Sequence, residues 1–406
     1  TILQSAFFKL ANIIPEEQAI DLMKKAAKAT YGRKGDDIVN MNYAAIDAGA
    51  QRIKEIQVPE SWKSCEDEAL GEGAIDAGTA AGRFAANIQR AVNGQEGNSL
   101  PVSAFKEYVD GNTPSGTAAF EKRGVATDVP VWNPDNCIQC NFCSYVCPHA
   151  VIRPVVTTEA EAAGAPAGMK KVPMMGMPGY YFTMSISSLD CTGCGSCANV
   201  CPGKKGEKAL TMQSFEENLA QQEVFDYGVK QEVKPEVLEK FKETTVKGSQ
   251  FKQPLLEFSG ACAGCGETPY AKLMTQLFGD RAYIANATGC SSIWGNSSPS
   301  TPYTTNAKGQ GPAWSNSLFE DAAEFGYGMK LAQNAVRSGL KAKIEKIVAD
   351  GKNEDVKAAA KEWIDTYEVG ALNGAATDKL VAALEACGCE HAQEILKRKD
   401  FLAKKS

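Results

Sequence analysis

Two runs of four cysteines are the residues of this sequence with the clearest chemistry. Each run has the spacing C-x2-C-x2-C-x3-C and is followed directly by a proline, Pro148 or Pro202. A cubane [4Fe–4S] cluster needs one thiolate per iron atom. Spacings of three residues let three sulfurs of one short loop converge on one cluster, whereas the fourth cysteine points to the other cluster. The spacing therefore predicts one cluster on Cys137, Cys140, Cys143 and Cys201, and a second on Cys191, Cys194, Cys197 and Cys147.

Zinc and disulfides are the alternatives for these cysteines, and both are disfavoured. Zinc ribbons use CxxC pairs, but they require neither a third cysteine three residues on nor the final Cys-Pro. Disulfides need an oxidising compartment, and no signal peptide opens the sequence. We therefore expect a cytoplasmic protein whose 14 cysteines serve metal rather than disulfides. The full run is typical of two-cluster bacterial ferredoxins.

Composition excludes several function classes. The 406 residues are enough for two to four domains, and 44% hydrophobic with 23% charged residues is ordinary for a globular protein. The net charge of -6 argues against nucleic-acid binding, and no apolar run is long enough to span a membrane. With His149 and His391 as the only histidines, a His-rich metal site is not expected. We expect His149 to pack or hydrogen-bond beside a cluster, and His391 to lie on the surface.

Periodicity places these motifs among helices and strands. An insertion, residues 148–190, separates the two motifs; we expect a loop that packs on the cluster domain through its methionines, followed by a strand at 180–187. A charged linker is expected at 216–253, and a helical region with breaks near Gly351 and Gly374 from 318 onward. The remaining expected elements are a helix opening at Pro15, a helix at 43–56, a helix at 270–278 and a strand at 281–288.

A third set of cysteines is less complete. Cys262 and Cys265 form a CxxC, which alone fits a redox dithiol, a zinc site or an accident of the surface. Gly264 and Gly266 let the backbone approach a large cofactor closely. Cys290 follows the strand expected at 281–288. The fourth ligand is not evident, although Cys387 or Cys389 could supply one.

Longer stretches of the sequence resemble pyruvate:ferredoxin oxidoreductases, the single-chain 2-oxoacid oxidoreductases of anaerobes. The resemblance runs over nearly the whole chain in the order found in that family. It is carried by residues 39–49 (VNMNYAAIDAG), 116–124 (GTAAFEKRG), 136–154 around the first motif, 287–295 (ATGCSSIWG) and 311–321 (GPAWSNSLFED).

The resemblance implies a multidomain α/β and α+β protein. It implies that a two-[4Fe–4S] bacterial ferredoxin-like domain with an insertion precedes the start of a thiamine-diphosphate-binding α/β domain. The expected divisions are the end of a gamma-type domain at 1–66, a small connecting domain named for its Glu-Lys-Arg run at 67–130, the cluster domain at 131–233 and the truncated thiamine domain at 234–406.

The resemblance also implies an activity: oxidative decarboxylation of pyruvate with coenzyme A, with electrons leaving one at a time through three [4Fe–4S] clusters to ferredoxin or flavodoxin. It implies that Cys262, Cys265 and Cys290 ligate the cluster nearest thiamine diphosphate. It further implies that Glu267 and Cys290 lie against the thiamine diphosphate, and that the site for this cofactor and its Mg²⁺ is incomplete in this sequence. A homodimer without nucleic-acid or membrane partners is expected.

The sequence departs from the family at the thiamine signature, Gly-Asp-Gly followed by a distant Asn. Gly279-Asp280-Arg281 lacks the second glycine, and Ala349-Asp350-Gly351 lacks the preceding strand. We therefore expect an internal fragment that is inactive alone, with no catalytic residue of its own and with the remaining N- and C-terminal portions completing the enzyme. The open alternatives are a self-standing two-cluster electron-transfer module, an enzyme for another 2-oxoacid, or one fused to a flavin reductase.

Overall fold

The structure is a computed structural model that describes residues 1–64, 75, 78–297 and 300–405. The chain forms two compact units, Thr1–Leu70 and Gly71–Ser406. Within the described residues, no helix combines the length and apolarity needed to cross a bilayer. The expected boundary between residues 66 and 67 lies outside the described residues, as does Cys65.

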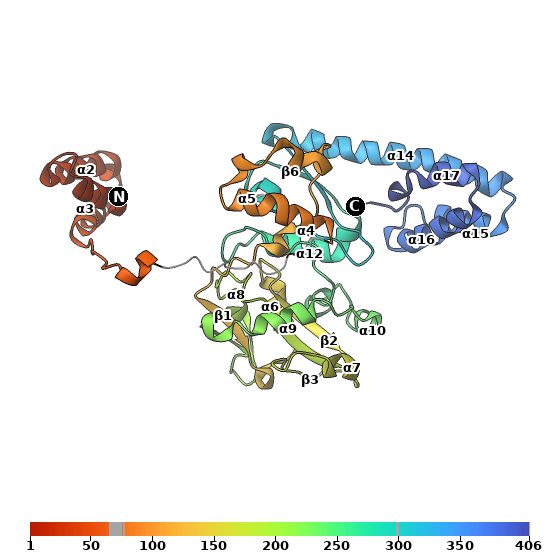
Figure 1. Cartoon of the computed structure of the whole chain (residues 1–406), viewed down its shortest axis with the longest axis horizontal. Helices are drawn as coiled ribbons and strands as arrows, with labels where there is room; N and C mark the ends of the chain where they lie inside the picture. The colour runs from red at the N-terminus through yellow and green to blue at the C-terminus, as the bar shows by residue number, and fades with distance from the viewer. Residues whose placement is uncertain (65–74, 76–77, 298–299, 406) are drawn as a thin grey trace. The chain divides into compact units, whose positions relative to one another are not determined.

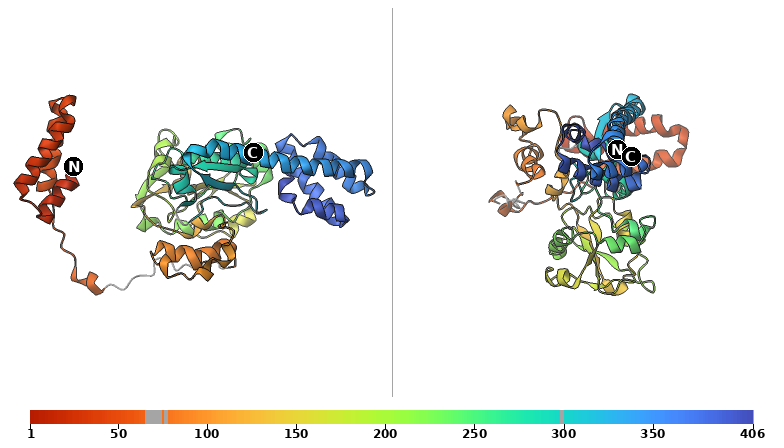
Figure 2. Two further views of the ribbon diagram at one scale, coloured as in Figure 1. Left: turned by 90° about the horizontal axis from the view of Figure 1, so that it is seen from above. Right: turned by 90° about the vertical axis from the view of Figure 1, so that its right-hand side faces the viewer.

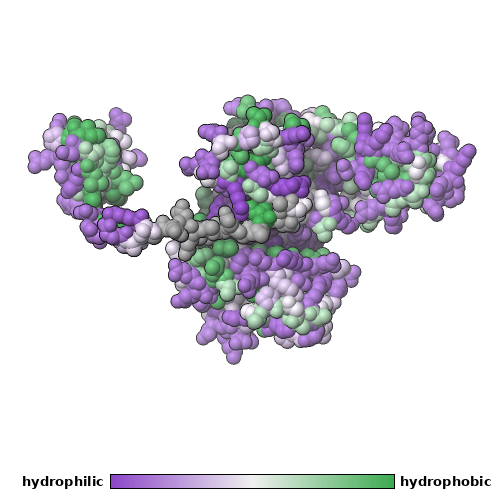
Figure 3. Space-filling view, viewed as in Figure 1, coloured by the Kyte–Doolittle hydropathy of each residue, from purple (hydrophilic) through white to green (hydrophobic). Residues whose placement is uncertain are grey.

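The first unit consists of three helices, α1 (Ile2–Ala11), α2 (Glu16–Tyr31) and α3 (Asp36–Gln51), with α3 packed on both others. The helix expected after Pro15 is confirmed. The helix expected at 43–56 instead spans α3, because two aspartates in its first turn favour an earlier start. Several large apolar side chains remain exposed on this unit, among them Leu3 and Leu10, and Figure 3 shows a hydrophobic patch on its helices.

The second unit contains two antiparallel sheets around the cysteine motifs. Strand β1 (Asp128–Trp132) pairs with β5 (Leu210–Ser214), so residues just before the first motif pair with residues just after the second. The other sheet has the order β2-β4-β3, with β2 at Ile152–Thr157, β3 at Val172–Pro173 and β4 at Tyr181–Ile186.

The insertion between the motifs is therefore more ordered than the expected loop. It forms all of the β2-β4-β3 sheet and the short helix α7 (Glu159–Ala163), because β-branched residues of β2 pair in register with β4. The expected strand at 180–187 is confirmed. The expected packing of the methionines is confirmed for Met174, which is buried in the core, and for Met177, which packs against it, but not for Met175, which is exposed.

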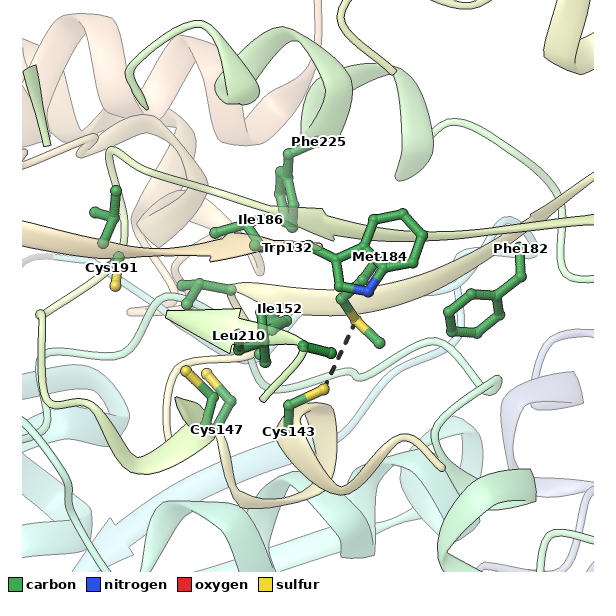
Figure 4. Packing of buried hydrophobic residues seen from close by; sticks show 14 of the residues in the cluster. Trp132, Cys143, Cys147, Ile152, Phe182, Met184, Ile186, Cys191, Leu210 and Phe225 are labelled. Atoms are coloured by element: carbon green, nitrogen blue, oxygen red, sulfur yellow. Dashed lines mark hydrogen bonds between the residues drawn. The ribbon is translucent and has the colours of Figure 1, made fainter. Parts of the chain in front are cut away.

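The core of this region lies between the sheets and the cysteines. Trp132 from β1 meets Phe182 from β4 edge to face, with ring centroids 6.0 Å apart. Figure 4 shows Met184 beside Cys143, whose sulfur is 4.0 Å from the methionine sulfur. The cysteine loops are thus anchored to an apolar core.

The segment expected as a charged linker, 216–253, is instead partly helical. It contains α9 (Gln221–Gly228), α10 (Pro235–Lys240) and α11 (Val246–Ser249). Helix α9 packs on β4, because its apolar residues Val224 and Phe225 face the sheet. Tertiary packing has overridden the high local charge.

A parallel pair of strands, β6 (Tyr283–Ala287) and β7 (Ala313–Ser317), carries the region of the third cysteine set. The strand expected at 281–288 and the helix expected at 270–278 are confirmed, the latter as α12 (Thr268–Phe278). Short helices α4 (Ala80–Phe84), α5 (Arg90–Asn93) and α13 (Cys290–Ser292) complete this part.

The long helix α14 (Ala322–Asp350) runs from β6 to three further helices, α15 (Glu354–Asp365), α16 (Gly370–Cys387) and α17 (Glu390–Leu396) (Figure 1; Figure 2). These four helices share a core around Trp363. The expected break near Gly351 is confirmed. The break expected near Gly374 is wrong, because Gly374 lies inside α16, where buried neighbours such as Leu380 stabilise the helix.

Candidate metal centres

The two four-cysteine loops follow the same backbone path. Two positions in each loop are left-handed: Gln139 (φ 53°) and Asn141 (φ 63°) in the first, and Gly193 (φ 67°) and Gly195 (φ 73°) in the second. Each loop continues into one short helix, α6 (Phe142–Val146) or α8 (Ser196–Val200), which ends one residue before the fourth cysteine. The duplicated sequence motif therefore produces a duplicated geometry.

Side-chain hydrogen bonds hold the first loop where glycine is absent. Left-handed backbone is costly for residues with a Cβ. Gln139 Nε2 donates to the carbonyl of Pro173 at 3.0 Å, and its Oε1 accepts from the N–H of Met175 at 2.9 Å. Asn141 Nδ2 donates to the carbonyl of Lys247 at 2.9 Å. The insertion thus supports the first cysteine loop directly.

Each loop lines a cavity into which four cysteines converge. Three come from one motif, and the fourth comes from the other motif. The first cavity is lined by Cys137, Cys140, Cys143 and Cys201, and the second by Cys191, Cys194, Cys197 and Cys147.

Helix packing explains why the fourth cysteines cross over. Helices α6 and α8 pack against each other. Each stops one residue before its last cysteine, and both Cys147 (ψ 119°) and Cys201 (ψ 115°) have extended backbone. The prolines that follow cannot continue a helix. Each fourth cysteine therefore leaves its own loop and reaches the neighbouring cavity.

The donor set fits a large cluster better than a single ion. Within the part of the chain that the structure describes, no three His, Cys, Asp or Glu side chains are grouped closely enough to hold one metal ion. A tetrahedral zinc site needs four donors about 2.3 Å from one centre. Four cysteines around a cavity match a cubane, in which each sulfur binds a different iron.

The electrostatics of the buried thiols also fit a cationic metal centre. Burial raises the pKa of Cys191 to about 12, and the pKa values of Cys143 and Cys197 are likewise raised, chiefly by burial. Such thiols would stay protonated by themselves, whereas coordination to a metal deprotonates a thiol outright. The apolar cavities therefore suit thiolates only when a metal supplies positive charge.

Backbone and indole N–H groups point at the same sulfurs or cavities. The N–H of Gln139 donates to Cys137 Sγ and that of Gly193 to Cys191 Sγ, both at 3.4 Å. The buried indole N–H of Trp132 lines the first cavity and faces the Cys137 thiol, whose pKa it lowers against the larger effect of burial. An indole donor at this place would stabilise a ligating thiolate. No sequence pattern indicated Trp132.

The CxxC loop of the third cysteine set adjoins the second cavity. Cys262 and Cys290 are exposed and Cys265 is partly exposed, with its N–H donating to the carbonyl of Cys262 at 3.0 Å. Between them, Gly264 has φ 72°, and a Cβ placed on it would lie 3.6 Å from Cys194 Cβ. The CxxC loop and the second four-cysteine loop are therefore in contact.

One hydrogen bond links Glu267 to the segment that carries Cys290. Glu267 stands at the start of α12, and its Oε2 accepts from the indole N–H of Trp294 at 3.4 Å. Cys290 begins α13, directly after β6 and four residues before Trp294. The structure thus joins the loop of the CxxC with the loop of Cys290.

The two histidines have different surroundings. His149 is buried beside the second cavity, with Nδ1 3.0 Å from the carbonyl of Ser259. Burial lowers its pKa, so the neutral ring is favoured. His391 is exposed on α17. Both placements are those expected.

The other cysteine pair lies in the C-terminal helices. Cys387 packs against the core of α14–α17, and its Sγ is 3.0 Å from that of Cys389. The contacts of this pair lie within the helical bundle. The structure therefore does not support Cys387 or Cys389 as the fourth ligand of the third cysteine set.

Comparison with known proteins agrees with this geometry. Residues 136–205 match the family of 4Fe-4S dicluster domains, and residues 73–126 match a family described as a domain of unknown function. A pyruvate-flavodoxin oxidoreductase of Enterobacter agglomerans is 50% identical over 91% of this chain and 31% of its own length. A pyruvate:ferredoxin oxidoreductase of Moorella thermoacetica is 48% identical over 100% of this chain and 34% of its own. The chain is a homologue of these pyruvate oxidoreductases.

The similarity covers only part of each oxidoreductase. The chain spans about a third of the length of the curated relatives named above. A pyruvate dehydrogenase [NADP(+)] of Cryptosporidium parvum is also similar, at 47% identity over 81% of this chain and 18% of its own length. The homologous oxidoreductases therefore share this segment while differing in their named electron acceptors.

Proposed function

We propose that this chain is the electron-relay segment of a pyruvate oxidoreductase. The observation that carries the proposal is the contact between Gly264 and Cys194, which joins the CxxC loop of the third set to the second of two cavities with four cysteines each. An isolated two-cluster module would have no use for a third cysteine loop held at one of its cavities.

Three [4Fe–4S] clusters would be held by this chain. The ligands would be Cys137, Cys140, Cys143 and Cys201 for the first; Cys191, Cys194, Cys197 and Cys147 for the second; and Cys262, Cys265 and Cys290 with a further ligand for the third. When bound, such clusters accept and release single electrons. Because the third set adjoins Cys194, the electron path would run from the third set to the second cavity and then to the first.

The protein around the cavities would set the conditions for this transfer. Burial of Cys143, Cys147, Cys191 and Cys197 excludes water from the ligands. Backbone N–H groups at Cys137, Cys191 and Cys201 stabilise thiolate charge. Short helices α6 and α8 fix the two loops relative to each other, so the spacing between the cavities is set by packing.

The electron source would be pyruvate bound at thiamine diphosphate. Glu267 and Cys290 would lie against this cofactor, at the start of a thiamine-diphosphate-binding α/β domain in residues 234–406. The rest of that site, the Mg²⁺ ligands, the coenzyme A site and the contacts of a homodimer would come from the rest of the polypeptide. Ferredoxin or flavodoxin in the cytoplasm would accept the electrons.

A dye assay on the whole polypeptide tests the proposal. Anaerobic protein is mixed with pyruvate, thiamine diphosphate, Mg²⁺ and coenzyme A, and viologen reduction is followed. We expect reduction that depends on pyruvate and is lost in Cys262→Ser. Clusters that dithionite reduces but pyruvate does not would instead support a self-standing electron-transfer module. Faster reduction with another 2-oxoacid would reassign the substrate.

A further inference from the structure

A buried lysine binds the short helix that connects the two four-cysteine cavities. Lys272, in the middle of α12, is 1% exposed. Its Nζ donates to the carbonyl of Ser144, to that of Cys147 at 3.1 Å and to that of Tyr145 at 3.3 Å. The lysine therefore binds the C-terminal end of α6, the helix that connects Cys143 with Cys147.

The hydrogen bonds of Lys272 leave its charge uncompensated. All three acceptors are neutral carbonyls, and no carboxylate forms an ion pair with Lys272 among the residues that the structure describes. Arg153, the other cation whose field reaches it, is already paired with Glu257. Buried charges are normally paired or bound to metal centres, because an isolated buried ion is costly.

The cysteines that flank the binding site of this lysine are proposed cluster ligands. Lys272 Nζ binds the carbonyl of Cys147 at 3.1 Å and that of Ser144, the residue directly after Cys143. Cys147 lines the second cavity and Cys143 the first. A [4Fe–4S] cluster with four thiolates carries net negative charge, which increases by one on reduction. Lys272 is thus placed to compensate that added charge.

We propose that Lys272 is a positioning residue whose ammonium stabilises the reduced state of both clusters, more strongly for the cluster bound by Cys147. The proposal rests on the proposed iron–sulfur function. It goes beyond ligand assignment, because it assigns control of reduction potential to a residue that binds no iron.

Redox titration followed by EPR tests this role in the intact protein. Lys272→Met removes the charge, Lys272→Gln removes it but keeps an N–H donor, and Lys272→Arg keeps it. In the Met and Gln variants we expect the reduction potential of the Cys147 cluster to fall by at least about 59 mV, which is a tenfold change in the equilibrium constant of a one-electron couple. The potential of the other cluster should fall less. The Arg variant should stay near wild type. Lys361→Met, on the exposed face of α15, is the matched control and should shift neither cluster.

Several results would overturn this role. Unchanged potentials in Lys272→Met and Lys272→Gln would contradict it, as would an Arg variant shifted as far as the neutral ones. If the neutral variants lose iron, an Arg variant that retains iron but has a shifted potential would be equally contradictory. Wild-type protein without two [4Fe–4S] signals would overturn the proposed function itself.

A second inference rests on Cys387 and Cys389, which lie outside the relay. Helix α16 ends at Cys387, and Gly388 reverses the chain with φ 61° before α17. This turn sets the two Sγ atoms 3.0 Å apart, with Cys389 exposed. We infer that the pair is a dithiol site that reduces low-molecular-weight disulfides.

The chemistry of the pair is a balanced thiol–disulfide exchange. The Cys389 thiolate attacks one sulfur of the small disulfide and releases one small thiol. Cys387 then attacks Cys389 Sγ of the mixed disulfide and releases the second thiol, leaving an intramolecular disulfide. Two electrons pass to the small disulfide, and both cysteine protons leave with its thiols. The Cys387 thiol lowers the pKa of Cys389 by hydrogen bonding, which favours Cys389 as the attacking group.

Peptide mapping gives a direct test, because tryptic cleavage after Lys379 and Lys397 isolates these two cysteines from all others. Anaerobic intact protein is treated with oxidised glutathione, alkylated and digested. We expect the peptide 380–397 to lose two hydrogens and resist alkylation, and Cys387→Ser to stop at a glutathionylated peptide. A wild-type peptide that is fully alkylated, or that retains glutathione, would overturn the inference.

Discussion

Gly264 lies directly against Cys194, with no side chain of its own between the CxxC backbone and the second four-cysteine loop. A Cβ on Gly264 would stand 3.6 Å from Cys194 Cβ and 3.8 Å from Ser196 Oγ. The backbone at this glycine is also left-handed, at φ 72°. Close approach and unusual backbone therefore coincide where the third cysteine set meets the relay.

Gly264→Ala should disturb this contact. An L-residue in left-handed backbone costs about 1–2 kcal/mol, so we expect the loop to relax away from Cys194. Reduction of the second cluster by pyruvate should slow several-fold, as measured by rapid-freeze EPR. Gly168→Ala is the control, because a Cβ there meets open space, the φ is not left-handed and the residue lies outside the cysteine loops. Equal rates in both variants would argue against direct transfer across this contact.

Exchange of ligands between the motifs predicts the result of Cys147→Ser. Although Cys147 belongs to the first motif, it lines the cavity of Cys191, Cys194 and Cys197. The variant should perturb the EPR signal of that cluster and leave the cluster of Cys137 intact. Cys201→Ser should give the reciprocal pattern. Loss of the sequence-neighbouring cluster in either variant would contradict the cross-over.

Gly193→Ala and Gly195→Ala separate backbone strain from crowding. Both glycines are left-handed, and each substitution should cost about 1 kcal/mol for that reason. A Cβ on Gly193 would also lie 3.1 Å from the carbonyl oxygen of Asp128, whereas one on Gly195 meets nothing within 4 Å. Crowding should add about 1–3 kcal/mol at Gly193 alone. The midpoint for loss of cluster absorbance in urea should therefore fall further for Gly193→Ala; equal midpoints would rule out crowding.

Arg337 should be a principal stabiliser of the α14–α17 helices. It is buried, and its guanidinium donates to the carbonyls of Leu402 at 3.2 Å and Tyr367 at 2.8 Å and to the side chain of Asn373 at 2.9 Å. Arg337→Ala leaves the carbonyl of Tyr367 without this donor, whereas Leu402 still accepts from Trp363 and Asn373 still accepts from Lys404. The substitution should therefore destabilise the bundle by about 1–3 kcal/mol.

Hydrogen exchange of the bundle amides measures this loss. The control is Lys379→Ala, which removes an exposed ion pair with Glu362 and should cost at most about 1 kcal/mol. Similar protection in both variants would show that Arg337 is not a central support of the bundle.

The sequence alone determined which cysteines could share a cluster and where several helices and strands lie. Spacing sets which sulfurs can converge in one loop, and that constraint is local. The helix α12 and the strand β6 were predictable for a similar reason, because the spacing of apolar residues along the chain is also a local property. The order in the insertion was not predicted, because the pairing of β2 with β4 joins residues far apart in the chain.

Only the tertiary structure decided what surrounds the cysteines. On α12 the buried positions are polar, Thr268, Lys272, Thr275 and Gln276, while Tyr270 is 73% exposed. Periodicity alone would turn that polar face to water. Lys272 points inward because the end of α6 supplies backbone carbonyls, and α6 comes from a segment more than a hundred residues earlier. Local patterns identify ligands, whereas compensation of buried charge depends on which distant segments the fold brings together.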